Sequence, residues 1–118
     1  MDFFRLTCPD RGTVIAERLG VADSFFSRLK GLLGRDALPE GEGLYIVPCD
    51  AIHMFGMRFS IDTVFVDEAL TVLEVFADVP IGGKASCRGA HGVLELPAGT
   101  AAKLGVAKGN RLSMSAIG

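Results

Sequence analysis

The sequence predicts a mainly β protein, either a compact antiparallel β sandwich or a distorted barrel, with one or two short helices. Three observations lead to this expectation. Regular turn signals separate short apolar runs, glycine is abundant at 15 residues, and several runs alternate polar and apolar side chains with a period of two. A chain of 118 residues is long enough to bury one core, so we expect residues 1–118 to form a single domain.

Six segments are predicted as strands: TVIAERL (13–19), GLYIV (43–47), DTVFVD (62–67), TVLEVFADV (71–79), GVLEL (92–96) and RLSMSAI (111–117). In the fourth and sixth, every second residue is apolar, which is typical of antiparallel sheets with one solvated face. In the third, Val64 and Val66 face one way and Phe65 the other. We therefore expect 62–67 to be buried on both faces, as a central strand.

Two short helices are predicted. Asp23 or Ser24 is placed to cap the first. Its apolar side chains follow helical spacing: Phe25, Phe26, Leu29, Leu32 and Leu33. Gly34 is a natural stop, although Gly31 offers an earlier end. The second helix lies in PAGTAAKLG, where Thr100 is the expected cap and Gly105 the end.

Composition excludes several classes of function. The net charge is −2 and the charges are interspersed, so the chain lacks the concentrated basic face that nucleic-acid binding requires. No apolar run approaches the ~20 residues of a membrane span. The first dozen residues carry acids and arginines instead of a secretory signal. Three cysteines, an odd number, favour free thiols. We therefore expect a cytoplasmic protein with no nucleic-acid or membrane partner.

Five segments in a fixed order resemble a known prokaryotic family: SRLKGLLGR, GEGLYIVPC, IHMFGMRFSIDTVFVD, VLELPAGTA and LGVAKGNRL. The family is the domain of unknown function 192, and the likeness spans roughly residues 14–115. It implies a small, mainly β domain. It implies no activity, because the biochemical role of the family is unsettled.

Position by position, the family motif R-x-x-G-L falls on Arg28, Gly31 and Leu32. The central segment follows the version of the motif in which Pro-Cys precedes Ile-His-x-Phe-Gly-Met-Arg-Phe-x-Ile-Asp. In this sequence His53 takes the place of a Trp found in the other version, and Asp62 keeps the acid at the end of the motif.

The leading functional hypothesis is a non-enzymatic binding or accessory protein. Residues 52–62 break the clean alternation of the flanking strands, and irregular loops on a rigid sheet often carry binding groups. We expect a pocket between this segment and the first helix, for a small molecule or a protein. The predicted ligand-binding residues are Arg28, His53, Met57, Arg58 and Asp62.

Asp62 shares a strand face with Val64 and Val66, so its carboxylate is expected to be partly buried. A buried carboxylate needs hydrogen-bond donors or a cation. Arg58 is the favoured partner, with Arg28 and backbone amides as alternatives. On the structural interpretation Asp62 anchors the loop; on the functional one it faces a pocket and binds a ligand.

A second hypothesis is a metal site. Both histidines follow a cysteine by four positions, and two thiolates with two imidazoles suit tetrahedral zinc: Cys49, His53, Cys87 and His91. With Met54 and Met57 nearby, copper is also conceivable. Four extended residues span roughly 13 Å, so each pair would need a turn.

A third hypothesis is a thiol hydrolase that uses Cys49, His53 and Asp62. Such groups are recognised by their positions in space, and a reactive thiol also requires a lowered pKa. The sequence shows no nucleophile elbow and no helix start aimed at Cys49. No catalytic residue is therefore assigned.

Overall fold

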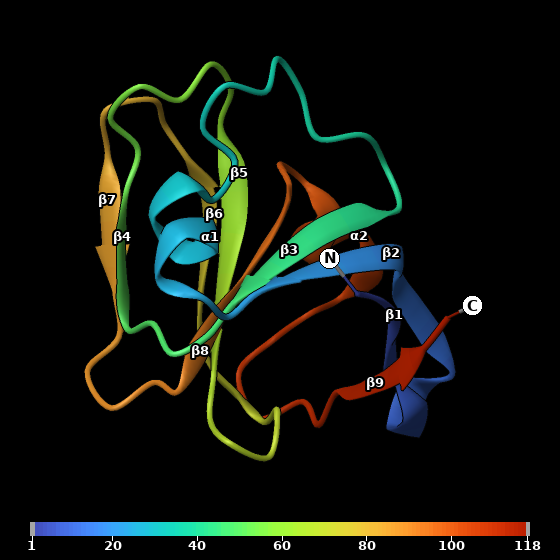
Figure 1. Ribbon diagram of the computed structural model, residues 1–118. Coiled ribbons are helices and arrows are strands. Elements are labelled where there is room, and N and C mark those ends of the chain that lie inside the picture. Colours follow the sequence, from blue (N-terminus) through green and yellow to red (C-terminus); the bar gives the residue numbers. More distant parts are fainter. Residues whose placement is uncertain (1, 118) are drawn as a thin grey trace.

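Seven strands form one mixed sheet in the computed structural model, which describes residues 2–117 (Figure 1). They are β1 (Phe3–Cys8), β2 (Thr13–Ala22), β3 (Glu42–Ile46), β5 (Ile61–Val66), β6 (Val72–Val79), β8 (Gly92–Pro97) and β9 (Ser113–Ala116). Their order across the sheet is β6-β5-β8-β3-β2-β1-β9. Two short strands, β4 (Ala51–His53) and β7 (Lys84–Ser86), pair separately as a ribbon. The helices are α1 (Phe25–Lys30), α2 (Thr100–Leu104) and a 3-10 turn, η1 (Pro9–Arg11).

The predicted fold class is confirmed: the protein is mainly β with two short helices. Across the described residues the sheet does not close into a barrel. One strand pair departs from the antiparallel prediction, because β2 and β3 run parallel. Parallel neighbours need a crossover connection, and α1 with the loop after it provides one between these two strands.

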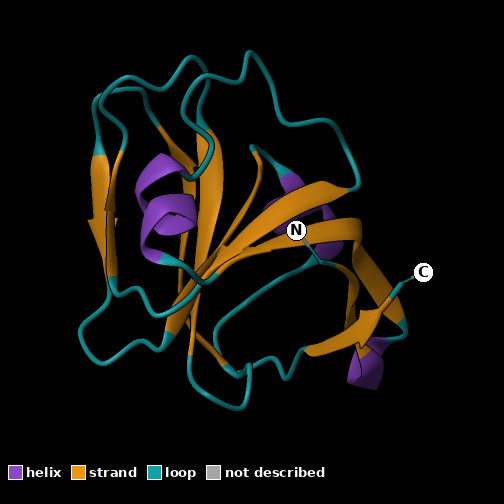
Figure 2. Ribbon diagram, viewed as in Figure 1, coloured by secondary structure: helices purple, strands orange, loops and turns teal. Residues whose placement is uncertain are grey.

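The sheet separates two hydrophobic clusters, one on each face. Alternate residues of the interior strands enter different clusters: Tyr45, Val64 and Leu94 pack into one, whereas Ile46, Phe65 and Val93 pack into the other. All six residues of β5 are buried, as predicted for a strand covered on both faces. In Figures 1 and 2, α1 and the β4–β7 ribbon lie over one face, and α2 lies over the other.

Helix α1 is short and leaves its apolar side chains uncovered. Ser24 caps it and exchanges hydrogen bonds with Ser27 in a capping box. It ends at Gly31, whose φ of 49° favours glycine. The predicted apolar stripe is wrong for its first members, because Phe25 is 67% exposed and Phe26 79%. Only after the chain leaves the helix does Leu32 enter the core.

Three strands were not predicted from the sequence: β1, β4 and β7. The predicted cap of α2 also differs, because Gly99 precedes the first helical residue and Thr100 is itself helical. Gly105 ends α2 in the left-handed conformation, as expected. Within residues 2–117, no helix has the length and apolar character needed to cross a bilayer.

Candidate functional site

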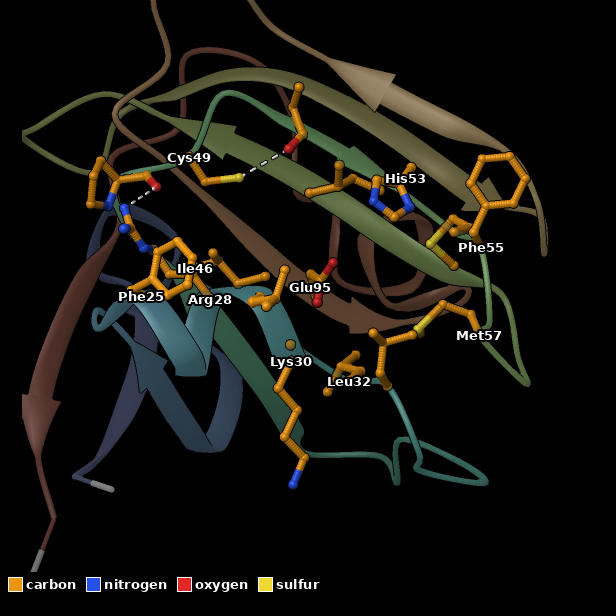
Figure 3. Close-up of a pocket in the computed structure, with 17 residues that line it drawn as sticks. Phe25, Arg28, Lys30, Leu32, Ile46, Cys49, His53, Phe55, Met57 and Glu95 are labelled. Carbon is orange, nitrogen blue, oxygen red and sulfur yellow. Dashed lines mark hydrogen bonds between the residues drawn. The ribbon is translucent and has the colours of Figure 1, made fainter.

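A cavity of about 320 Å³ opens between α1 and strand β4. Figure 3 shows α1 on one side of this space and the segment from Cys49 to Met57 on the other. Its apolar walls include Leu32, Ile46 and Met54, and two of its polar side chains are His53 and Glu95. The volume lies at the lower end of the range typical of small-molecule pockets.

Glu95 lies on β8, an interior strand of the sheet. Its strand neighbours are Leu44 on β3 and Thr63 on β5. The residue is only 5% exposed, and its carboxylate extends into the cavity (Figure 3). Burial raises the pKa of Glu95 to about 7. Among the described residues, no hydrogen bond or ion pair reaches this carboxylate.

Gly31 brings the end of α1 close to this acid. A Cβ atom at Gly31 would lie 3.9 Å from Oε1 of Glu95 and 3.7 Å from Cδ1 of Ile46. Both are ordinary van der Waals distances, so the positive φ is what favours glycine here. The family motif position Gly31 therefore lies beside the buried carboxylate.

Arg28 lies at another part of the same cavity. Its Nη1 donates to the carbonyl of Pro48 at 3.3 Å. Its Nε is buried and, among the residues that the structure describes, is the one such side-chain nitrogen or oxygen without a hydrogen-bond partner. Buried polar groups are usually satisfied, so this donor is unusual; the Glu95 carboxylate, which also lacks a partner among residues 2–117, borders the cavity space itself.

The predicted ligand-binding residues divide into two groups. Arg28, His53 and Met57 line the cavity. Arg58 does not, because its guanidinium forms an exposed ion pair with Asp36. The favoured Arg58–Asp62 pair is therefore wrong, and the predicted pocket extends to only part of the 52–62 segment.

Asp62 is fully buried on the opposite side of the sheet, where α2 begins. Its Oδ1 accepts the backbone N–H groups of Asp78 at 2.8 Å and Gly99 at 3.2 Å. Its Oδ2 accepts the N–H of Ala101 at 2.8 Å. These partners are backbone amides, which were one of the alternatives to Arg58 in the sequence-based prediction. Through them the carboxylate connects β5 to β6 and to the first turn of α2. Asp62 is thus an anchor within the fold and does not line the cavity.

The four residues of the hypothetical zinc site are not gathered around one point. Within residues 2–117, no group of three His, Cys, Asp or Glu side chains is placed to hold a metal ion. His53 is the last residue of β4 and borders the α1 cavity, whereas His91 borders a different surface hollow beside Asp67 and Glu68. The turns that the C-x3-H pairs would need do not bring the two imidazoles together.

The hypothetical hydrolase triad is also not assembled. Asp62 faces α2, whereas Cys49 and His53 border the α1 cavity. The Cys49 thiol donates to the carbonyl of Ala51 at 3.1 Å, and His53 packs against Phe55 with ring centroids 5.6 Å apart. Burial raises the pKa of the Cys49 thiol, which lowers the fraction of reactive thiolate at neutral pH. The three cysteines are free.

Sequence reasoning missed Glu95. The segment GVLEL was predicted as a strand, but no role was assigned to its acid. One signal was available: Val93 shares a strand face with Glu95, and Leu94 shares the other with Leu96, so apolar residues on both faces favour a strand that is covered on both sides. The end of α1 and the segment that contains β4, which was not predicted, line the cavity around this acid.

The family model for domain of unknown function 192, described as "Uncharacterized ACR", matches residues 7–114. The chain belongs to this family. A crystal structure of a protein of unknown function from Novosphingobium aromaticivorans is 25% identical, with a TM-score of 0.80 over 94% of this chain and 83% of that one. A protein of Sinorhizobium meliloti that bears the name "putative transcription regulator" is 24% identical, with a TM-score of 0.82 over 96% and 92%. No curated protein matches the sequence.

In this DUF192 domain, the family motif segments meet at the two buried acids. Arg28, Gly31 and Leu32, from R-x-x-G-L, line the cavity together with Glu95. Asp62, from the central motif, instead binds the start of α2. The matched segments thus contribute to both faces of the sheet.

Proposed function

We propose that this DUF192 domain is a non-enzymatic binding protein, and that the cavity between α1 and β4 holds a small organic molecule with an apolar body. One observation carries the proposal: a cavity of about 320 Å³ combines apolar walls with two polar groups that lack partners among the described residues, the carboxylate of Glu95 and Nε of Arg28. Apolar pockets with a few convergent polar groups and a perturbed pKa are the usual places for ligands.

The rim of the cavity supports the same proposal. Phe25 and Leu29 on α1 and Phe55 across the opening are all exposed. Large exposed apolar groups gathered at one place are uncommon on soluble domains and mark surfaces that contact a ligand or partner. Here they surround a concave site, so they extend the apolar wall for the part of a small molecule that leaves the cavity.

The name of the Sinorhizobium protein contributes no function to this proposal. An identity of 24% supports a shared fold alone. The net charge of −2 is also unfavourable for contact with the phosphate backbone of DNA.

A fragment titration tests the proposal. Benzyl alcohol added to ¹⁵N-labelled protein is expected to shift the amide resonances of Leu32, Ile46 and Met54 in a saturable manner. Ala51→Trp places an indole at the cavity mouth and should abolish these shifts, because Ala51 is an exposed lining residue. Ala77→Trp, at an exposed position of β6 outside the cavity, should leave them unchanged.

Two results would contradict the proposal. One is the absence of saturable shifts at the cavity residues. The other is that Ala51→Trp, once its spectrum shows that it is folded, binds benzyl alcohol as the wild type does.

A further inference from the structure

The carboxylate of Glu95 is buried next to strand neighbours that offer it no hydrogen bond, so its presence is not explained by the stability of the fold. Its strand neighbours are Leu44, which is apolar, and Thr63, whose hydroxyl donates to the carbonyl of Phe76 at 3.4 Å. Neither supplies a donor to the acid. Burying a polar group without a hydrogen bond is unfavourable, and an apolar residue at such a position is often more stabilising.

The charged and titratable side chains that share the cavity also leave Glu95 without a partner. Arg28 is directed to the carbonyl of Pro48, and Figure 3 shows the Lys30 ammonium extending away from the cavity. The Cys49 thiol donates to Ala51. His53 packs beside Phe55 and forms no ion pair with Glu95. No cation among residues 2–117 neutralises this acid.

We propose that Glu95 selects ligands that carry a protonated nitrogen on an apolar body. This inference rests on the proposed function, because it assigns the ligand class of the same cavity. An ammonium or amidinium group brings both the positive charge and the N–H donors that the carboxylate lacks, and charge-assisted hydrogen bonds are stronger than neutral ones. Leu32, Ile46 and Met54 then contact the apolar body.

The burial of the acid gives the selectivity a pH dependence. Because the pKa of Glu95 is about 7 in the free protein, the carboxyl is partly protonated near neutrality. A cation pairs with the ionised form, so its binding releases a proton from Glu95 and tightens as pH rises from about 6 to about 8. An alkylamine stays protonated over this interval, as the Lys side chain does with a pKa of roughly 10. A neutral ligand of the same shape gains nothing from the ionisation.

The test compares benzylamine with benzyl alcohol, which share an aromatic body and differ in the charged group. Binding is measured by titration of amide resonances at about pH 8. We expect wild-type protein to bind benzylamine at least about tenfold more tightly than benzyl alcohol, a difference that corresponds to roughly 1.4 kcal/mol. Glu95→Gln should abolish this preference while keeping affinity for benzyl alcohol. Asp50→Asn, which removes an exposed acid near Cys49 but outside the cavity, should keep the preference.

The possible outcomes separate the two proposals. If both probes bind in the cavity with equal affinity, or if Glu95→Gln retains the preference for the amine, the role of Glu95 is overturned and the binding function stands. If neither probe binds, the binding function fails and this inference fails with it. Should Glu95→Gln not fold, the wild type alone decides: benzylamine affinity must rise between about pH 6 and pH 8, and a flat profile overturns the inference.

Discussion

Two carboxylates on adjacent strands of this sheet are both buried, yet their surroundings are opposite. Asp62 on β5 faces α2 and accepts three backbone N–H groups. Glu95 on β8 faces the α1 cavity and accepts none from the described residues. The first is saturated by the fold, so it stabilises the fold. The second has no hydrogen-bond partner among the described residues, so it can bind a ligand that supplies N–H donors.

The covering elements account for the difference. On the α2 side the start of the helix presents its free amides directly to Asp62, which satisfies both partners. On the α1 side the helix contains only six residues, ends at Gly31 and buries none of its own side chains. Across the cavity, the segment from Cys49 to Met57 leaves the space above Glu95 open (Figure 3).

The largest effect is expected on removal of the saturated acid. Asp62→Ala leaves three N–H donors without their acceptor, and unsatisfied buried donors are each unfavourable by about 1–3 kcal/mol. We therefore expect the free energy of unfolding, measured by urea denaturation, to fall by at least about 3 kcal/mol. Asp36→Ala, at an exposed ion pair, is the control. Equal stability of the two variants would show that Asp62 is not an anchor.

The unsatisfied acid is expected to behave in the opposite way. The folded pKa of Glu95 is raised from the ordinary 4.5 to about 7, so the folded state binds its proton more strongly than the unfolded state. The free energy of unfolding of the wild type, relative to that of Glu95→Gln, should therefore be highest below about pH 4.5. It should fall by up to about 3 kcal/mol as pH rises from there to about 7. Other acids titrate in both proteins, so the difference between the two curves isolates Glu95. A constant difference would contradict this account.

Substitutions of Leu32 and Leu29 compare the contributions of the inner wall of the cavity and of its rim to the free energy of unfolding. Leu32 is buried and Leu29 is exposed, although both belong to the predicted apolar stripe. Leu32→Ala should lower the free energy of unfolding by about 2–3 kcal/mol. Leu29→Ala should change it by less than about 1 kcal/mol, because a surface side chain contributes little burial. A comparable loss in both would mean that α1 packs more tightly than described.

The smallest effect is expected for Arg58, whose ion pair with Asp36 is exposed. Arg58→Ala should change stability by no more than about 1 kcal/mol. It should also leave benzyl alcohol binding unchanged, since Arg58 does not line the cavity. A loss of binding in this variant would show that Arg58 contributes to the binding site.

Much of the fold and part of the site could be predicted from the sequence. Alternation and short apolar runs between turn signals identified six of the strands, and β5 was correctly expected to be buried on both faces. The irregular 52–62 segment led us to expect a pocket beside the first helix; Arg28, His53 and Met57 line the cavity there, and their role in ligand binding stays a prediction. The partner of Asp62 could not be chosen, because the amides of Gly99 and Ala101 are remote in sequence and reach it only through the packing of α2. Glu95 was missed because the segment that lies across the cavity from it contains β4, and a three-residue strand carries too few alternations to be recognised.

The central claim, that Glu95 is a buried acid without a partner in the free protein, is tested most directly by its own titration. The ¹³C resonance of the Glu95 side-chain carboxyl, assigned by comparison with Glu95→Gln, can be followed as a function of pH. The account predicts a midpoint near 7 in the free protein, and a lower midpoint when benzylamine is bound. A midpoint near the ordinary 4.5 in the free protein would contradict it.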